Sequence, residues 1–557
     1  MEKRTIIAFV LSFLVLVGWS FFFTPKQQPI QPAEEDTQEV YQGQPQKTDQ
    51  SNTSTPYITS SEQSRQETDQ KIITAVSEKE IRVETPLYIV TFSNNSAAIN
   101  SVMLKQYQQT TEPDSPPIEL VTIKDNSEDF FSTAFEGQTP SDSEKILYEV
   151  NADRIILTDN SAPKDLIFKG IRADGIKIEQ IFRFYPNNYD IGLNITLKNS
   201  SQYTVSGNIK AYLANLPPEK KGSYYSFNGF ALLLNNELET LKTKKLDEEK
   251  YFSGDIDWIA YEDDYFISAI IPEDMKEGGF TAKAMDSGLI KAAYIAPPID
   301  IHPMSGISSK FNLYMGPRDL NILTQHGKKL DKAIDYGFFD IIAKPLHYVL
   351  RFFYKHVHNY GVAIILLTVL IKIIFWPLTH KSYKSMKEMQ KLQPLMAKIR
   401  EKYKNDKEQM QKELMGLYKT YKVNPMGGCL PMVIQIPVFF ALFRILGNSI
   451  ELRHAPFFLW INDLSAPDRL FSFPFQIPFM SEPYGIPVLT LLMGASMFIQ
   501  QKMTPTPGDP SQAKVMLFLP IIFTIMFINF PSGLVLYWLV NNVLSIGQQY
   551  RIKKGPG

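Results

Sequence analysis

Six long apolar runs divide the chain, and they alternate with much more polar stretches. The first run, residues 6–23, has 18 uncharged residues, and the run at 361–378 has 18 residues with a single charge. Runs of this length and hydropathy are typical of helices that cross a lipid bilayer. The four shorter runs lie at about 426–447, 486–500, 515–530 and 533–546. The pattern therefore predicts a polytopic α-helical membrane protein with six spans, the shortest of which would thin the bilayer locally.

The region between the first two runs follows a different periodicity. Alternate positions are apolar in two neighbouring stretches, and Pro186-Asn187-Asn188 between them is a turn signal. The residues that share this period of two are Ile176, Ile178, Ile191, Leu193, Ile195 and Leu197. Runs rich in β-branched and aromatic residues at 87–92 and 265–271 indicate further strands. We therefore predict a large all-β sandwich over residues 76–325.

The N-terminal run predicts an uncleaved signal anchor over residues 1–24. Two basic residues precede the run and three phenylalanines end it. Bulky aromatic residues are poor determinants of signal-peptide cleavage but good interfacial anchors. Residues 25–75 are rich in Gln, Ser, Thr and Pro and have too little apolar surface to fold, which predicts a flexible acidic linker.

Two amphipathic patterns flank the run at 361–379. Before it, over 335–360, apolar residues at helical spacing alternate with basic ones, which is typical of a helix lying in the membrane interface. After it, residues 380–424 contain two amphipathic stretches separated by Asn405-Asp406, which predict a helical hairpin whose first helix is bent at Pro394.

Methionines are prominent on the apolar side of this hairpin, at Met386, Met389 and Met396. Flexible thioether side chains suit varied apolar partners, so they are candidates for capturing a hydrophobic segment. A plain hydrophobic seam between the two helices explains the same residues nearly as well.

The distribution of charge is more informative than its total. The net charge is −1 and the mean hydropathy is −0.14, values that average two unlike regions. Residues 379–424 contain twelve Lys and Arg against five acidic residues, and the tail at 549–557 is also basic. The loop at 448–484 has two Arg against four acidic residues. The positive-inside rule therefore places both termini and the hairpin in the cytoplasm and the sandwich outside, with the last four spans within 425–548.

Lys372 is the single charge in the run at 361–378, and it is the main candidate for a functional site. A lysine near the centre of a membrane helix costs about 2.5–3.5 kcal/mol on insertion scales. This cost is tolerated where the charge faces a wet cavity or a partner. Snorkelling to the headgroups is the alternative, but a lysine stem reaches only part of the way to the end of the span.

Several exact motifs in the C-terminal part resemble the YidC/Oxa family of membrane protein insertases. They include Trp376-Pro377-Leu378-Thr379, Leu392-Gln393-Pro394, Lys422-Val423-Asn424-Pro425, Gly427-Gly428-Cys429 and Phe530-Pro531-Ser532-Gly533-Leu534. The resemblance covers residues 360–549, and the layout of anchor, exported β-domain and five-helix core is similar to that of Gram-negative members. The exported domain is matched more weakly, through Asp257-Trp258-Ile259-Ala260 and Gly316-Pro317.

The resemblance implies an inner-membrane insertase with a periplasmic sandwich and a hydrophilic groove open to the cytoplasm and the lipid. Lys372 stands where family members of this type usually have Arg, which keeps the charge but loses the bidentate geometry. The family pattern implies that Thr368 and Gln435 also line the groove. The passenger's apolar span would then slide along Ile436, Pro437 and the aromatic face near Trp538 into the lipid.

The resemblance also implies the partners. These are nascent membrane proteins, membrane lipids and, as further expectations, the Sec translocon and the translating ribosome, without specific nucleic-acid binding. No cofactor, metal or enzymatic step is expected, and the chain lacks a GxxxxGK[ST] phosphate loop.

Two other classes of function remain as alternatives. A secondary transporter would use Lys372 as a coupled site, but such proteins usually contain two similar halves, and no repeat pairs the apolar runs. A carbohydrate-binding or carbohydrate-processing sandwich on a membrane stalk would use aromatic residues such as Trp258, Tyr261 and Tyr265 in a groove. Packing of these three residues in the core explains them at least as well.

Overall fold

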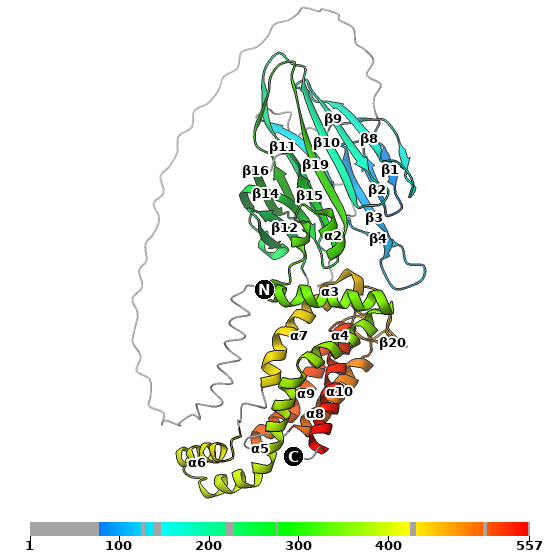
Figure 1. The fold of residues 1–557 in the computed structure, drawn as a ribbon. Helices are drawn as coiled ribbons and strands as arrows, with labels where there is room; N and C mark the ends of the chain where they lie inside the picture. The colour runs from blue at the N-terminus through cyan, green and yellow to red at the C-terminus, as the bar shows by residue number, and fades with distance from the viewer. Residues whose placement is uncertain are drawn as a thin grey trace, which may run out of the picture. The chain divides into compact units, whose positions relative to one another are not determined.

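The computed structural model describes residues 77–123, 128–137, 146–217, 227–274, 277–423, 430–504 and 510–554 (Figure 1). The predicted anchor at 1–24 and linker at 25–75 lie outside these residues, as do Asn424 to Cys429 of the quoted motifs. Two regions follow one another along the described chain. The first consists almost entirely of strands and the second almost entirely of helices.

The strands form two antiparallel sheets that share β14, apart from one parallel pair between β1 and β7. In spatial order, the first sheet contains β7 (Arg154–Ile156), β1 (Glu80–Glu84), β2 (Tyr88–Ser93), β3 (Ala98–Gln108), β5 (Phe131–Gly137), β11 (Val205–Asn215), β17 (Ile290–Ile295), β16 (Glu277–Ala284) and β14 (Lys250–Glu262). Two short strands extend it, β4 (Pro117–Glu119) beside β3 and β18 (Ile299–Ile301) beside β11.

The second sheet contains the two strands that the period of two predicted. Its order is β6 (Glu149–Val150), β8 (Lys164–Ile171), β9 (Ile176–Phe184), β10 (Asp190–Asn199), β19 (Gly306–Pro317), β15 (Phe266–Pro272), β14, β12 (Gly229–Leu234) and β13 (Glu237–Lys242). The predicted turn at Pro186-Asn187-Asn188 joins β9 to β10, which pair antiparallel with Leu193 opposite Phe182. The strand predictions at 176–197 are therefore confirmed.

The two sheets pack face to face through aromatic side chains. The ring of Phe92 on β2 lies 4.9 Å from that of Phe182 and 5.7 Å from that of Phe168, both on the second sheet. Trp258 and Tyr261 are also buried, and the Trp258 indole donates a hydrogen bond to the Lys329 carbonyl at 3.3 Å. Core packing is therefore the role that the structure gives these two residues.

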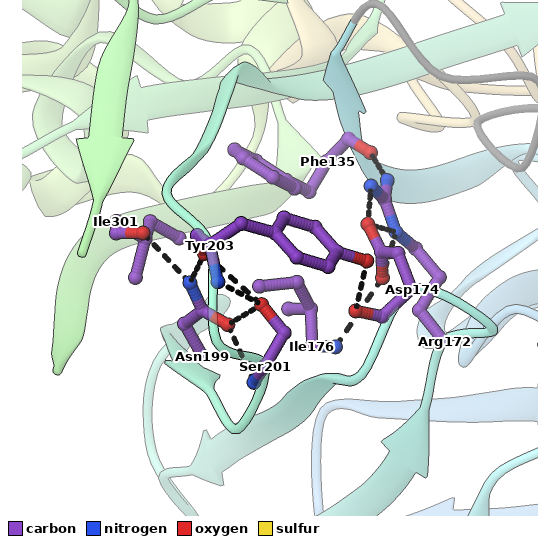
Figure 2. A network of polar contacts seen from close by, with 8 residues as sticks. All are labelled: Phe135, Arg172, Asp174, Ile176, Asn199, Ser201, Tyr203 and Ile301. Carbon is purple, nitrogen blue, oxygen red and sulfur yellow. Dashed lines mark hydrogen bonds and ion pairs between the residues drawn. The ribbon is translucent and has the colours of Figure 1, made fainter. Parts of the chain in front are cut away.

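A buried ion pair fixes the turn between β8 and β9 (Figure 2). The Arg172 Nε donates to both carboxylate oxygens of Asp174 at 3.0 Å, and another guanidinium nitrogen donates to the Phe135 carbonyl on the first sheet. The Tyr203 hydroxyl donates to the Asp174 carbonyl, while Asn199 donates to the Tyr203 carbonyl at 2.7 Å. Burial alone would raise the pKa of Asp174, but its hydrogen bonds from Arg172 hold that pKa below its usual value.

The helical region begins with short elements and an amphipathic helix. They are α2 (Leu320–His326), η3 (Leu330–Ala333), η4 (Gly337–Phe339) and α3 (Asp340–Val357). On α3, Ala343, His347 and Leu350 are buried, whereas Ile341 and Phe352 are exposed. The predicted amphipathic helix is therefore present, although it covers only part of 335–360, and its exposed face also carries large apolar side chains.

The remaining helices occupy the predicted apolar runs and the hairpin. They are α4 (Tyr360–Ile374), α5 (Trp376–Lys402), α6 (Lys407–Thr420), α7 (Leu430–Asn448), α8 (Val488–Met503), α9 (Pro510–Phe527) and α10 (Ser532–Lys554). Between α7 and α8 lie the short helix η6 (Ile450–Leu452) and a two-stranded hairpin of β20 (Leu470–Phe473) and β21 (Tyr484–Ile486).

Within the described residues, no helix taken singly has both the length and the apolar composition of a membrane span. The pair α4 and α5 meets these criteria when the two helices, which meet at 65°, are taken together.

The bend between α4 and α5 differs from the predicted uninterrupted span at 361–379. The helix ends at Ile374, and Pro377 stands at the start of the next one. Proline has no amide hydrogen to donate to the carbonyl of Ile373, and it disfavours helical geometry in the residue before it. By contrast, α5 continues through Pro394, where the sequence predicted the bend. The helix α6 returns alongside α5, as predicted for a hairpin (Figure 1).

Candidate functional site

Lys372 lies on α4 and is only 8 % exposed. Its ammonium nitrogen is 2.6 Å from the Ser545 hydroxyl oxygen and 3.5 Å from the Asn541 side-chain oxygen, both on α10. Lys372 stands in the last turn of α4, not near the centre of a long helix as expected, and its ammonium group turns sideways to the neighbouring helix α10. A hydrogen-bonded partner on a neighbouring helix offsets much of the free energy that burial of a charge costs.

The face of α10 that meets Lys372 is polar over two turns. Asn541, Ser545 and Gln548 follow the spacing i, i+4, i+7, so they lie one above the other on the same side of the helix. The Ser545 hydroxyl donates to the Asn541 carbonyl at 2.7 Å, which leaves its oxygen to accept from the ammonium group. Gln548 donates to the Thr379 hydroxyl at 2.9 Å. These three residues complete the charged site, and none of them was predicted from the sequence.

A small cavity lies beside the lysine. Its volume is about 20 Å³, which is room for about one water molecule. The lining residues are Ile371, Lys372, Phe375, Leu378, Thr379, Ile434, Gln435 and Asn541. The structure thus places Lys372 and Gln435 at the same cavity, and their role in a substrate groove stays a prediction. Gln435 also donates to the Tyr537 hydroxyl at 3.4 Å.

Thr368 is not part of this lining. It lies one turn before Lys372 and is buried, but its hydroxyl donates to the Ile364 carbonyl of its own helix at 2.7 Å. A threonine bonded to the preceding turn has no hydroxyl hydrogen left for a cavity. The small cavity beside Lys372 is therefore not lined by Thr368, and a role of Thr368 in a groove stays a prediction.

The residues of the expected slide lie on two neighbouring helices. Ile436 and Pro437 are half-buried on α7, and Trp538 is half-buried on α10. The Trp538 ring lies 4.7 Å from that of Phe439 on α7 and 4.9 Å from that of Phe527 on α9. Trp538 therefore anchors an aromatic cluster where three helices meet, and its ring is partly accessible.

The hairpin methionines are buried. Met386 is 8 % exposed, Met389 2 % and Met396 3 %, and the Tyr418 hydroxyl of α6 lies 3.8 Å from the Met396 sulfur. This arrangement matches the seam between helices rather than an open apolar surface. A 3- and 4-residue period identifies the apolar face of a helix but not what covers it. Direct capture by these three buried side chains would require the helices packed around them to move apart.

The sandwich contains a larger cavity, of about 230 Å³, between its sheets. Its charged lining is already paired. Glu136 lies 2.5 Å from Lys210, Lys291 lies 3.2 Å from Glu128, and Arg172 forms the ion pair described above. Among the residues that the structure describes, no group of three or more His, Cys, Asp or Glu side chains is placed to hold a metal ion. The buried lysine and its α10 partners are therefore the stronger candidate site.

Comparisons with known proteins match nearly the whole chain. Residues 352–556 match the family model of the 60Kd inner membrane protein, and residues 80–349 match that of the YidC periplasmic domain. The chain is 42 % identical over 564 residues to the membrane protein insertase YidC of Syntrophobacter fumaroxidans, with all of both chains covered. It is also 42 % identical over 558 residues to the insertase YidC of Syntrophus aciditrophicus, again with full coverage.

A crystal structure of an active YidC insertase with its first transmembrane domain resolved is also similar. It is 18 % identical, covers 85 % of this chain and 93 % of its own, and has a TM-score of 0.37, too low to support an argument about the fold. The family models and the full-length identity carry the assignment. The chain belongs to the YidC family of membrane protein insertases.

Proposed function

We propose that this protein moves hydrophobic segments of newly made proteins from the cytoplasm into the inner membrane, alone or with the Sec translocon. The observation that supports this most is the buried ammonium group of Lys372, held by Ser545 and Asn541 on α10. A charge in this setting is expensive, and such groups within membrane helices mark pathways for polar substrates.

The proposed topology has six spans with both termini in the cytoplasm. The anchor at 1–24 and the α4, α7, α8, α9 and α10 helices would cross the membrane, and the sandwich would be periplasmic. The twelve basic residues at 379–424 and the basic tail support this orientation. The α3 helix would lie in the periplasmic interface, with the exposed Ile341 and Phe352 toward lipid.

The proposed mechanism shortens the path that polar groups must take through hydrocarbon. Each charge or unsatisfied backbone group that crosses a bare bilayer costs several kcal/mol. A groove around Lys372 and Gln435, hydrated from the cytoplasm, would extend the aqueous phase partway across. An acidic residue in the passenger's exported tail would be drawn transiently to the ammonium group, displacing Ser545 or Asn541.

Release into lipid would provide the driving force. The passenger's apolar span would leave the groove along Ile436, Pro437 and the partly accessible ring of Trp538. Burial of some 20 apolar residues is favourable by about 0.8 kcal/mol per methylene group, so the step needs no nucleotide or cofactor. The protein would thus act without covalent chemistry.

The hairpin would meet the passenger first. Its basic surface suits the cytoplasmic headgroups and the translating ribosome, and movement of the helices packed around Met386, Met389 and Met396 would expose these buried side chains. Contact between these methionines and the passenger would require this movement, because the three side chains are buried. We propose contacts with Sec components as well.

Depletion of the protein in its native cell tests the proposal directly. Quantitative proteomics of the inner membrane should show a selective loss of newly made membrane proteins, because their spans would no longer be transferred into lipid. An inner-membrane proteome unchanged after depletion would contradict the proposed function.

The minimal insertase should lie beyond Tyr336, since the lysine site, the slide and the hairpin all do. We expect removal of residues 95–312, with the anchor and α3 retained, to leave substantial insertion activity. Complementation of a depletion strain measures this, with membrane levels of the truncated protein followed by blot. Loss of activity at normal protein level would assign the sandwich a direct part in insertion.

A further inference from the structure

The loop between α7 and α8 presents large apolar side chains on its surface. Phe471 is 69 % exposed, Phe475 59 % and Phe479 81 %, and Leu459 earlier in the same loop is 86 % exposed. Residues 470–481 contain no charged side chain. Single exposed apolar residues are ordinary, but a neutral segment with several exposed phenylalanines marks an interaction surface.

The polar groups of the same loop are turned inward. The Arg469 guanidinium donates to the carbonyls of Pro483 and Ile528, each at 2.8 Å. The Asn529 side chain accepts from the Ser481 amide at 2.8 Å and donates to the Phe479 carbonyl at 2.9 Å. The loop thus fastens its backbone to the connection between α9 and α10. This is the reverse of a loop in water, where polar groups face solvent and apolar ones face the core.

Backbone conformation supports the same conclusion. Leu459, Phe471 and Phe479 have φ values of 61°, 58° and 64°, in the left-handed region that side chains other than glycine rarely adopt. Such a conformation is unfavourable and persists only where the surrounding structure imposes it. For Phe471 and Phe479, the hydrogen bonds of Arg469 and Asn529 hold the neighbouring backbone in place, so these two side chains are fixed in their outward position.

The start of the loop is fixed to the interfacial helix. The His347 Nε2 of α3 lies 3.2 Å from the carboxylate of Glu451. Burial alone would raise the pKa of Glu451, but the hydrogen bond with His347 and the charge of Arg351 hold that pKa below its usual value. The start of the loop is thereby joined to α3, whose exposed residues include Ile341 and Phe352.

We propose that the 458–481 segment inserts its phenylalanines into the headgroup boundary of the periplasmic leaflet. The inference rests on the proposed function, because the depth of the loop relative to the bilayer follows from α7 to α10 crossing it. The loop connects the ends of α7 and α8 and is bonded to the α9–α10 connection, so it would lie where these helices leave the membrane. Aromatic side chains without charge fit that boundary. The anchor would hold the periplasmic ends of the helices at a fixed depth.

Depth measurement on the full-length protein tests this surface. In a Cys429→Ser background, a single cysteine replaces Phe471, Phe475 or Phe479 and carries an environment-sensitive nitrobenzoxadiazole label. The protein is reconstituted into vesicles of phosphatidylethanolamine and phosphatidylglycerol. The matched control is Met304→Cys in the sandwich, where the native side chain is 84 % exposed. We expect blue-shifted emission, quenching by nitroxide lipids and loss of iodide quenching in the loop, with the reverse pattern at position 304.

Two outcomes would overturn the anchor. Labels quenched by iodide at all three loop positions would place the loop in water, and labels shielded from both quenchers would indicate a protein partner or a passenger. Insertion by the same labelled proteins is measured in parallel. Active protein with labels in water refutes the anchor alone, whereas inactive Cys429→Ser protein with labels in lipid refutes only the proposed function.

Discussion

Lys372→Ala is expected to reduce membrane insertion strongly, while Lys372→Arg retains it. Alanine removes the ammonium group that Ser545 and Asn541 hold in the cavity, and arginine keeps a positive charge there. A hydrogen bond that involves a charged group contributes about 1.5–3 kcal/mol. If the ammonium group makes such a bond in the rate-limiting step, its removal corresponds to roughly a ten- to hundredfold fall in the rate of insertion. Pulse-labelled insertion in a depletion strain measures the effect.

The matched control removes a lysine elsewhere. Lys355 is exposed on α3, so Lys355→Ala changes the net charge equally and should insert passengers normally. Protein levels of all variants are compared by blot. Normal growth and insertion with both Lys372→Ala and Lys372→Glu would refute the charged-groove mechanism.

Deletion of residues 386–421 is expected to abolish insertion even where the remaining helices stay folded. The deletion removes most of α5 and all of α6, whose length exceeds what a connector needs. A flexible Gly/Ser segment of equal length restores the connection without the helices. Insertion of a radiolabelled passenger, normalised to protein level, reports the result.

The matched control for this deletion retains the hairpin and changes its surface. Lys412→Gln with Lys419→Gln keeps the helix and its buried seam, so it separates loss of charge from loss of the hairpin. Photo-crosslinkers at Met389 or Met396 should capture ribosome-bound nascent chains if the hairpin opens. Crosslinks confined to lipid or to α6 would leave the methionines with a structural role only, and normal insertion by the deletion variant would refute the hairpin's role altogether.

Periodicity predicted much of the architecture because it reports directly on which face is buried. The alternation at 176–197 predicted both strands and their turn, because alternate apolar residues lie on one face of a strand and that face must be the buried one. The same reasoning located the apolar helices and the amphipathic α3. It did not provide the sheet order or the crossing of β14 between sheets, because those depend on contacts distant in sequence.

The lysine was recognisable in the sequence, but its environment was not. Averaging hydropathy over the last apolar run concealed Asn541 and Ser545, and Gln548 lies just beyond that run, although their i, i+4, i+7 spacing was a usable signal. Thr368 lies on the same face of α4 as Lys372, but its hydroxyl donates to the Ile364 carbonyl of its own helix. The sequence does not reveal which acceptor a threonine hydroxyl uses. The bend at Phe375 follows from Pro377, which the sequence analysis used only as part of a motif.

Insertion by the purified protein is the most direct test of the central claim. Full-length protein is reconstituted into lipid vesicles without nucleotide or other proteins, and a single-span passenger with an acidic exported tail is added during synthesis. Protease protection measures the fraction inserted. We expect protection well above that of empty vesicles, and a return toward that background with Lys372→Ala. Equal protection in empty vesicles, or equal insertion by the wild-type and Lys372→Ala proteins, would contradict it.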